Sequence, residues 1–211
     1  MSDALPAGMI LAGGRSRRMG GQTKALLDLN GIPLVQHVVQ RLRPQVASLV
    51  LSVEQKTASL DFPDLPQVED VAPGSNGPLG GLLAVMEEVS RRSEWLLMCP
   101  CDAPLLPVDL GKQLMQRIMV DGGAVCAVRY EHHIQPTFSL WNCRVLPELR
   151  TAVMEDHLGG FRAFFDRVKL SELVWGKAAV SPFFNVNTPK DLEQAAMLVD
   201  QAKDRIDPGP E

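Results

Sequence analysis

Short apolar runs alternate with longer amphipathic segments along the whole chain, and this alternation constrains the fold more than any other feature. The short runs have the length of buried strands, and the longer segments carry apolar residues at helical spacing. Strands that alternate with helices are typical of βαβ units around a mostly parallel sheet. We therefore predict an α/β protein: a single three-layer, Rossmann-like domain with helices on both faces of a twisted sheet.

The same pattern places the individual elements. Strands are expected at 7–11, 48–53, 95–99, 124–128, 137–141, 170–174 and 183–186, with a further short strand ending at 70. Helices are expected at 33–43, 79–89, 106–120, 143–153 and 160–167. A last helix should begin at Pro189 with Thr188 as its N-cap. Because no repeat or linker interrupts this order, residues 1–211 are expected to form one domain with a frayed tail beyond about 204.

Composition excludes several classes of protein. The net charge of −4 and the pI near 5.6 argue against a globally basic nucleic-acid binder. The apolar runs fall well short of the roughly 18–20 residues of a membrane span, and the first residues carry no secretion signal. The four cysteines have the spacing of neither a zinc site nor a disulfide framework. We expect buried free thiols in a cytoplasmic protein that binds neither nucleic acid nor membranes.

The loop after the first expected strand is rich in glycine and basic residues. Four of the six Lys and Arg residues in 1–44 lie between Arg15 and Lys24, and no acid lies among them. In open parallel sheets ligands bind outside the carboxyl ends of the strands. Glycine lets the backbone approach a ligand, and basic side chains neutralise phosphate charge. The loop matches neither a Walker A motif nor a dinucleotide fingerprint. A solvated basic loop is the alternative, but the position after a buried strand favours a phosphate site.

Two acids also follow expected strands. Asp102 ends an apolar run and is flanked by prolines, which favours a rigidly held carboxylate of the kind that binds Mg²⁺ together with substrate phosphates. The alternative is an N-cap for the helix expected at 106. Asp70 precedes the Gly- and Pro-rich segment 77–82. The structural interpretation of this segment is a turn followed by a helix start. His132 and His133 are expected in a polar surface loop rather than at a metal.

Several stretches together resemble a known family. In order they are 11–14 (Leu-Ala-Gly-Gly), 18–24 (Arg-Met-Gly-Gly-Gln-Thr-Lys), 29–34 (Leu-Asn-Gly-Ile-Pro-Leu), 101–104 (Cys-Asp-Ala-Pro), 135–141, 160–162 (Gly-Phe-Arg) and 184–189 (Phe-Asn-Val-Asn-Thr-Pro). They resemble the nucleotidyltransferases with a sugar-nucleotide-pyrophosphorylase type of fold, and within that superfamily the molybdenum cofactor guanylyltransferases. The resemblance extends from about Ala7 to Leu192.

This resemblance implies transfer of GMP from GTP to molybdenum-loaded molybdopterin, with release of pyrophosphate. It implies catalytic roles for Arg18, Lys24 and Asp102, with Mg²⁺ on Asp102. The implied GTP-binding residues are Leu11, Ala12, Gly13, Gly14, Arg15, Lys24, Ser52, Asp70, Gly77, Pro78, Leu79 and Asp102. The implied molybdopterin-binding residues are Gln135, Arg162, Asn185 and Asn187. The N-terminal half would thus bind the nucleotide and the C-terminal half the molybdopterin, in a monomer whose further partners are cofactor-biosynthesis proteins and molybdoenzyme chaperones.

Two positions depart from the family pattern, and two other functions stay open. Thr23 stands where relatives commonly have Asp, and Ser52 stands where they often have Asn. A related cytidylyltransferase is one alternative, although such enzymes tend to have Ala at the position of Gly13. Glycine there leaves room for a purine base, which favours GTP. A non-catalytic carrier or chaperone of the cofactor is the other alternative.

Overall fold

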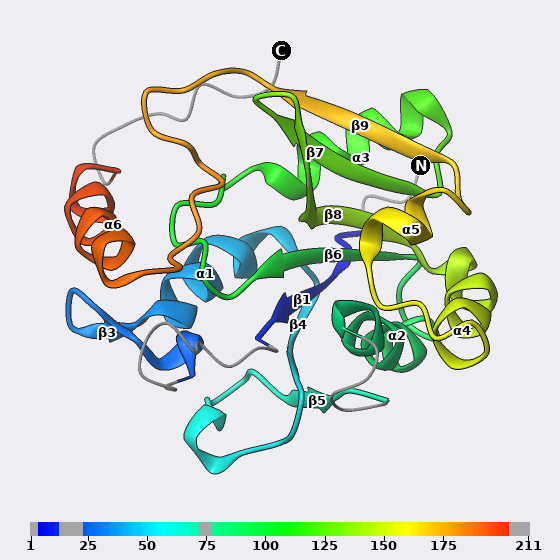
Figure 1. Ribbon diagram of the computed structural model, residues 1–211, viewed down its shortest axis with the longest axis horizontal. Coiled ribbons are helices and arrows are strands. Elements are labelled where there is room, and N and C mark those ends of the chain that lie inside the picture. Colours follow the sequence, from blue (N-terminus) through cyan, green and yellow to red (C-terminus); the bar gives the residue numbers. More distant parts are fainter. Residues whose placement is uncertain (1–3, 13–22, 72–76, 203–211) are drawn as a thin grey trace.

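A seven-stranded sheet forms the centre of the computed structural model, which describes residues 4–12, 23–71 and 77–202 (Figure 1). Its strands are, in spatial order, β5 (Gln67–Glu69), β4 (Ser48–Val53), β1 (Ala7–Leu11), β6 (Trp95–Pro100), β8 (His133–Asn142), β7 (Val125–Tyr130) and β9 (Leu170–Trp175). Only β8 runs against its neighbours β6 and β7; every other described pairing in this sheet is parallel. The predicted mostly parallel sheet is therefore confirmed.

Helices cover both faces of the sheet, as predicted. On one face α1 (Leu34–Leu42) and α3 (Leu110–Asp121) bury their apolar side chains. On the other face α2 (Gly77–Val89), α4 (Leu146–Met154) and α5 (Phe161–Phe165) do the same. The central strand β6 shows why two layers are needed, because Leu97 and Cys99 join the first cluster while Leu96 and Met98 join the second. A strand buried on both faces is apolar at every position rather than at every other one.

The last helix, α6 (Pro189–Ala202), packs beside a small hairpin at the edge of the molecule (Figure 1). The hairpin consists of β2 (Asp28–Leu29) and β3 (Ile32–Pro33), and the sequence analysis did not predict it. Its turn is Asn30-Gly31, both with positive φ (55° and 86°), which is the Asn-Gly signal of a two-residue hairpin turn. Leu29 and Val186 share an apolar cluster with Ala195 of α6.

The strand predicted at 183–186 was wrong. This segment forms no ladder, and Phe183 and Val186 are buried by packing instead. The Phe183 ring lies edge-on to Phe138 and Trp175, with centroids 4.9 and 5.3 Å apart. A short apolar run satisfies a strand and a packed loop equally well, so periodicity alone did not separate them.

Other boundaries also moved. α3 begins at Leu110 rather than at 106, because residues 103–109 form turns that include Pro104 and Pro107. α2 begins at Gly77, two residues before the predicted start. β8 begins at His133, so only His132 of the two histidines lies in the turn before it, with a φ of 69°.

All four cysteines are free and buried, as predicted. Burial raises the pKa of Cys101 to about 12, so this thiol stays protonated at neutral pH. No helix among the described residues is long and apolar enough to cross a membrane.

Candidate active site

Backbone hydrogen bonds bring several predicted site residues to one edge of the sheet, where β1, β4, β5 and β6 end. The amide of Ala12 donates to the carbonyl of Ser52 (2.9 Å), and the amide of Cys101 donates to the carbonyl of Leu11 (3.1 Å). The amide of Asp70 donates to the carbonyl of Val53 (3.0 Å). The ladder thus continues one residue past these strands. The segment carrying Asp102 leaves the sheet beside the start of the basic loop, and the segment carrying Asp70 leaves it beside the end of β4.

A lysine joins the two halves of the chain at this edge. The Nζ atom of Lys24 donates to Oδ2 of Asp102 (2.8 Å) and to Oδ1 of Asn187 (2.6 Å). The side chains of Lys24 and Asp102 are 21% and 14% exposed, so the pair is reachable from solvent but largely enclosed. An ammonium shared by two oxygens at an open edge marks a place where charge is concentrated and a phosphate can be held.

Asn187 is held in place by its neighbours in the sequence. The amide of Val186 donates to the carbonyl of Asp102 (2.8 Å), which ties this segment to the end of β6. The carboxylate of Asp191 accepts from the amides of Asn187 (3.0 Å) and Thr188 (2.8 Å), and Oγ1 of Thr188 accepts from the amide of Asp191 (3.2 Å). This reciprocal cap confirms Thr188 as the N-cap of α6. The amide donors hold the pKa of Asp191 below its usual range.

The alternative reading of Asp102 as a helix cap does not fit the structure. α3 begins at Leu110, with Asp109 in the capping position. Asp102 instead faces Lys24, so its carboxylate is available to the site. Together with the amide oxygen of Asn187 it forms an oxygen donor set of the kind that Mg²⁺ prefers. Among the described residues, no group of three or more His, Cys, Asp and Glu side chains could hold a metal by itself.

Asp70 and Ser52 form a second cluster at the ends of β5 and β4. Ser52 is buried, and its hydroxyl hydrogen-bonds the Asp70 carboxylate. A Cβ atom on Gly81 of α2 would lie 2.3 Å from Oγ of Ser52 and 2.6 Å from Oδ1 of Asp70, so only glycine permits this approach. Burial and the charge of Glu54 raise the pKa of Asp70 to about 6, while the Ser52 hydrogen bond opposes the rise. From the sequence, Gly81 could belong to a helix start or border the nucleotide, and neither interpretation predicts this contact.

The residues assigned to molybdopterin are less closely grouped. Gln135 lies in β8, directly before an irregularity in its pairing with β7 that leaves residues 136–138 out of the β7 ladder. The buried Oδ1 atom of Asn185 has no hydrogen-bond partner among the described residues, so it can accept from a donor of a ligand or a water molecule. Arg162 lies on the exposed side of α5, and no hydrogen bond or ion pair among the described residues connects it to Lys24 or Asn187.

Some predicted residues lie elsewhere or cannot be placed. Gly13, Gly14, Arg15 and Arg18 lie outside the described residues. Gly77, Pro78 and Leu79 form the first turn of α2. The side chain of Leu79 is fully buried, so Leu79 can offer a nucleotide only its backbone.

Gly77 makes an additional contact that the sequence did not reveal. With its φ of +52°, a Cβ atom there would lie 2.7 Å from the carbonyl oxygen of Gly159, two residues before the start of α5. The first turn of α2 therefore touches the loop that precedes Arg162.

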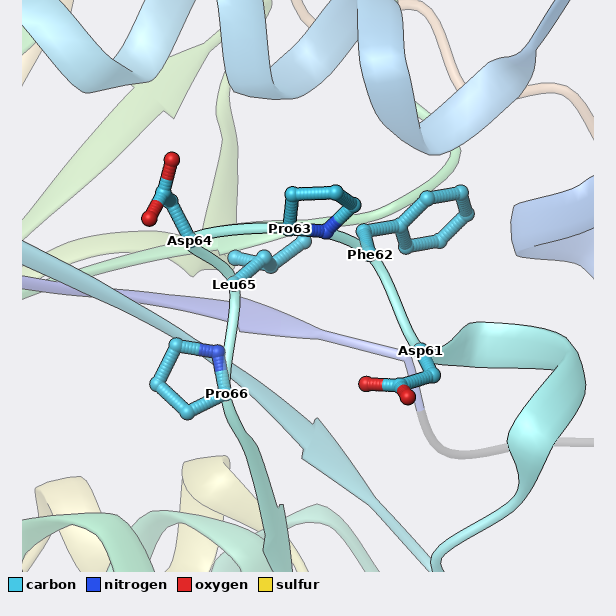
Figure 2. Close-up of a pocket in the computed structure, with 6 residues that line it drawn as sticks. All are labelled: Asp61, Phe62, Pro63, Asp64, Leu65 and Pro66. Carbon is cyan, nitrogen blue, oxygen red and sulfur yellow. The ribbon is translucent and has the colours of Figure 1, made fainter.

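A separate pocket of about 480 Å³ lies in the loop between β4 and β5 (Figure 2). Residues 61–66 line it, and the guanidinium of Arg43 donates to the carbonyl of Asp64 (2.8 Å). Because this loop leads into the amino end of β5, the pocket lies away from the edge that carries Lys24 and Asp102.

Comparison with known proteins identifies the family of this chain. Residues 8–172 match the family described as the MobA-like NTP transferase domain. A molybdenum cofactor guanylyltransferase of Rhodopseudomonas palustris is 34% identical over 198 residues, which cover 92% of this chain and 94% of that protein. One from Vibrio cholerae is 36% identical over 190 residues, which cover 90% and 91%. The structure of molybdopterin-guanine dinucleotide biosynthesis protein A from Archaeoglobus fulgidus superposes with a TM-score of 0.74 at 18% identity, covering 92% of this chain and 99% of that one.

Proposed function

The chain belongs to the MobA-like NTP transferase family, and we propose that it transfers GMP from GTP to molybdenum-loaded molybdopterin. The observation that carries this proposal is the Lys24 ammonium held between Asp102 and Asn187. Asp102 follows a strand of the nucleotide side, and Asn187 belongs to the segment assigned to molybdopterin. The geometry therefore supports a site at which two phosphate-bearing substrates meet.

In this reaction a phosphate oxygen of molybdopterin attacks the α-phosphorus of GTP. A new P–O bond forms, the bond between the α-phosphorus and the α–β bridging oxygen breaks, and that oxygen leaves with pyrophosphate. Such transfers need little covalent participation from the protein and depend on positioning and on neutralising phosphate charge. Lys24 is suited to the second task because its ammonium lies at the meeting point of the two sides. Arg18, outside the described residues, is proposed to assist it.

We infer that Asp102 also holds Mg²⁺, with the amide oxygen of Asn187 as a further donor. Both atoms are hard oxygen ligands at an open edge, and they already hold one cation, the Lys24 ammonium. When bound, the metal supplies positive charge to the phosphates of the nucleotide. Lys24 orients both oxygens, so the same three residues serve the metal and the phosphates.

The remaining assignments follow the two sides of the sheet. The nucleotide side comprises Ser52, Asp70, the first turn of α2 and the loop that begins with Leu11 and Ala12. Gly13, Gly14 and Arg15 of that loop are included on sequence alone. The molybdopterin side comprises Gln135, Arg162, Asn185 and Asn187. We also propose a monomer acting in the cytoplasm, where four buried free thiols remain reduced.

Release of pyrophosphate tests this function directly. Purified protein is incubated with Mg²⁺ and GTP or CTP, with and without molybdopterin, and kcat/KM is measured for each nucleotide. We expect release that depends on molybdopterin and prefers GTP. Stoichiometric binding without release would instead support a cofactor carrier, and a preference for CTP would support a cytidylyltransferase.

The variant Gly13→Ala sharpens the same assay. An added methyl group at a packed purine contact is expected to lower kcat/KM for GTP about ten- to hundredfold while affecting CTP less. An equal loss for both nucleotides would contradict a role of Gly13 in base selection. The dependence on Mg²⁺ and molybdopterin should not change.

A further inference from the structure

The hydroxyl group of Ser52 has a single proton and can donate it to only one acceptor. The resemblance implied that Ser52 contacts GTP, yet its hydroxyl hydrogen-bonds the carboxylate of Asp70. Both side chains lie against the same point of α2, because a Cβ atom on Gly81 would be 2.3 Å from Oγ of Ser52 and 2.6 Å from Oδ1 of Asp70. The hydroxyl, the carboxylate and the glycine therefore form one packed unit.

The charges around this unit are all negative among the described residues that act on Asp70. Glu54 directly follows β4, and Glu69 is the last residue of β5. The first turn of α2 carries no acidic side chain, and the acids of that helix, Glu87 and Glu88, lie in its last turn. Nothing in these elements offsets the burial of the carboxylate except the Ser52 hydroxyl.

We propose that Ser52 is a positioning residue, which fixes the Asp70 carboxylate against Gly81 so that Asp70 accepts the hydrogen-bond donors of the bound nucleotide. This inference rests on the proposed nucleotidyltransferase function. It assigns the serine, which stands where relatives often have asparagine, a role that acts through Asp70 rather than on the nucleotide itself.

The proposal makes nucleotide binding sensitive to protons. An ionised carboxylate accepts hydrogen bonds at both oxygens, whereas a protonated one loses part of that capacity. With a pKa of about 6, Asp70 changes its state just below neutral pH. The affinity for GTP should therefore be high above that value and should fall as the pH is lowered through it.

The test is the dissociation constant of GTP, measured by calorimetry from mildly acidic to mildly alkaline pH. Four proteins are compared: the wild type, Ser52→Ala, Glu54→Gln and Asp70→Asn. Ser52→Ala removes a hydrogen bond that favours the charged form, so the acidic fall in affinity should move to higher pH by roughly half a unit or more. Glu54→Gln removes a charge that disfavours the ionised form of Asp70, so the fall in affinity should move to lower pH. Asp70→Asn should weaken binding about tenfold at neutral pH and lose this dependence.

The decisive readout is the difference between variants in the pH at which the affinity for GTP falls. A phosphate group of GTP also titrates near this pH, but it contributes equally in all four proteins. A purely structural effect of the substitutions would weaken binding at every pH without moving the fall. If Ser52→Ala and Glu54→Gln leave the fall unmoved, or move it in the same direction, the proposal is wrong. Glu54→Gln also keeps the test decisive should Ser52→Ala fold poorly, since it leaves the packed unit intact.

Failure of the proposed function gives a different result. If the wild type binds CTP and not GTP at any pH, the guanylyltransferase assignment fails. The same four proteins titrated with CTP then still decide the role of Ser52. With GTP as the ligand, the analogues 2′-deoxy-GTP and ITP show which donors Asp70 accepts: loss of the pH dependence with the first assigns the ribose, and with the second the base.

Discussion

The two sides of the sheet that we propose for the nucleotide and for molybdopterin are built in different ways. On the nucleotide side, β1, β4, β5 and β6 run parallel, and Ser52, Asp70 and Asp102 lie at or just beyond the carboxyl end of a strand. On the other side β8 runs in the opposite direction, and its pairing with β7 is interrupted before residue 136. Asn185 and Asn187 belong to no strand at all.

The two sides therefore differ in what fixes their functional groups. A ladder of backbone hydrogen bonds fixes the first set, so its geometry follows from the sheet. The second set depends on a few particular contacts: the Val186 amide on Asp102, the cap formed by Thr188 and Asp191, and the Lys24–Asn187 hydrogen bond. We expect changes on the nucleotide side to affect chemistry with little effect on structure, and changes in these contacts to affect binding of the acceptor.

The largest effect is expected from Asp102→Asn. The substitution keeps the shape of a side chain that follows β6 but removes the charge that faces Lys24 and the proposed metal. Turnover should fall by about a hundred- to thousandfold or more, while the unfolding midpoint changes little. The measurement is pyrophosphate release with saturating Mg²⁺. Asp109→Asn, at the start of α3, is the matched control and should keep near-normal activity; a wild-type rate for Asp102→Asn would exclude the assigned role.

An intermediate effect is expected where the two sides touch. Gly77→Ala places a methyl group 2.7 Å from the carbonyl of Gly159 at a φ of +52°, whereas Gly31→Ala meets no atom within 4 Å at a φ of +86°. Both variants carry backbone strain of about 1–2 kcal/mol, and only the first adds a steric cost of about 1–3 kcal/mol.

Denaturant unfolding and the KM for molybdopterin separate the two costs. Gly77→Ala should be the less stable variant, and it alone should raise the KM for molybdopterin, because the Gly159 loop leads to Arg162. Equal effects of both variants would show that the two sides do not communicate through this contact.

The smallest effect is expected from Thr188→Ala, which removes the N-cap of α6. Loss of such a cap costs about 1 kcal/mol of stability, and the loosened Asn187 should raise the KM for molybdopterin severalfold. Thr57→Ala removes a comparable cap in the loop after β4, where Oγ1 accepts from the amide of Ser59 at 3.4 Å, and should leave that KM unchanged. A higher KM for both variants, or for neither, would contradict the dependence on local anchors.

The contribution of this cap to the stability of the protein depends on pH. The pKa of Asp191 is lowered in the folded protein, so its contribution is complete above the ordinary value for an aspartate. It is lost as the pH falls toward the folded-state value. Thr188→Ala should lower stability less below the ordinary pKa of an aspartate, where Asp191 becomes protonated, than at neutral pH.

The sequence predicted the nucleotide side far better than the other side. The bounds of β1 and β4 agree with the expected 7–11 and 48–53, because strands buried on both faces are apolar throughout and end abruptly. The segment at 183–186 is just as apolar, yet it is buried against rings rather than paired in a ladder. Nothing local in the sequence distinguishes the two cases.

Among the candidate site residues, the sequence singled out individual residues but did not predict which of them contact one another. Lys24 and Asn187 were both singled out, but their contact spans 163 positions and no local pattern encodes it. The packing of Ser52 and Asp70 on Gly81 depends on where α2 crosses two strands, which only the folded chain determines. The Asn30-Gly31 hairpin is the opposite case, since its turn signal was present and was not used.

The Lys24–Asn187 contact also bears on the order in which the protein becomes competent during synthesis. Asn30 is likewise tied to α6, through its side-chain amide and the carbonyl of Ala196, across 166 positions. Ribosomes add roughly 5–20 residues per second. The parallel strands β1, β4, β5 and β6 are therefore synthesised seconds before α6 exists. Until Asn187 has been added, Lys24 can have only one of its two oxygen partners, Asp102. The candidate site is therefore complete only when the last part of the chain has been synthesised.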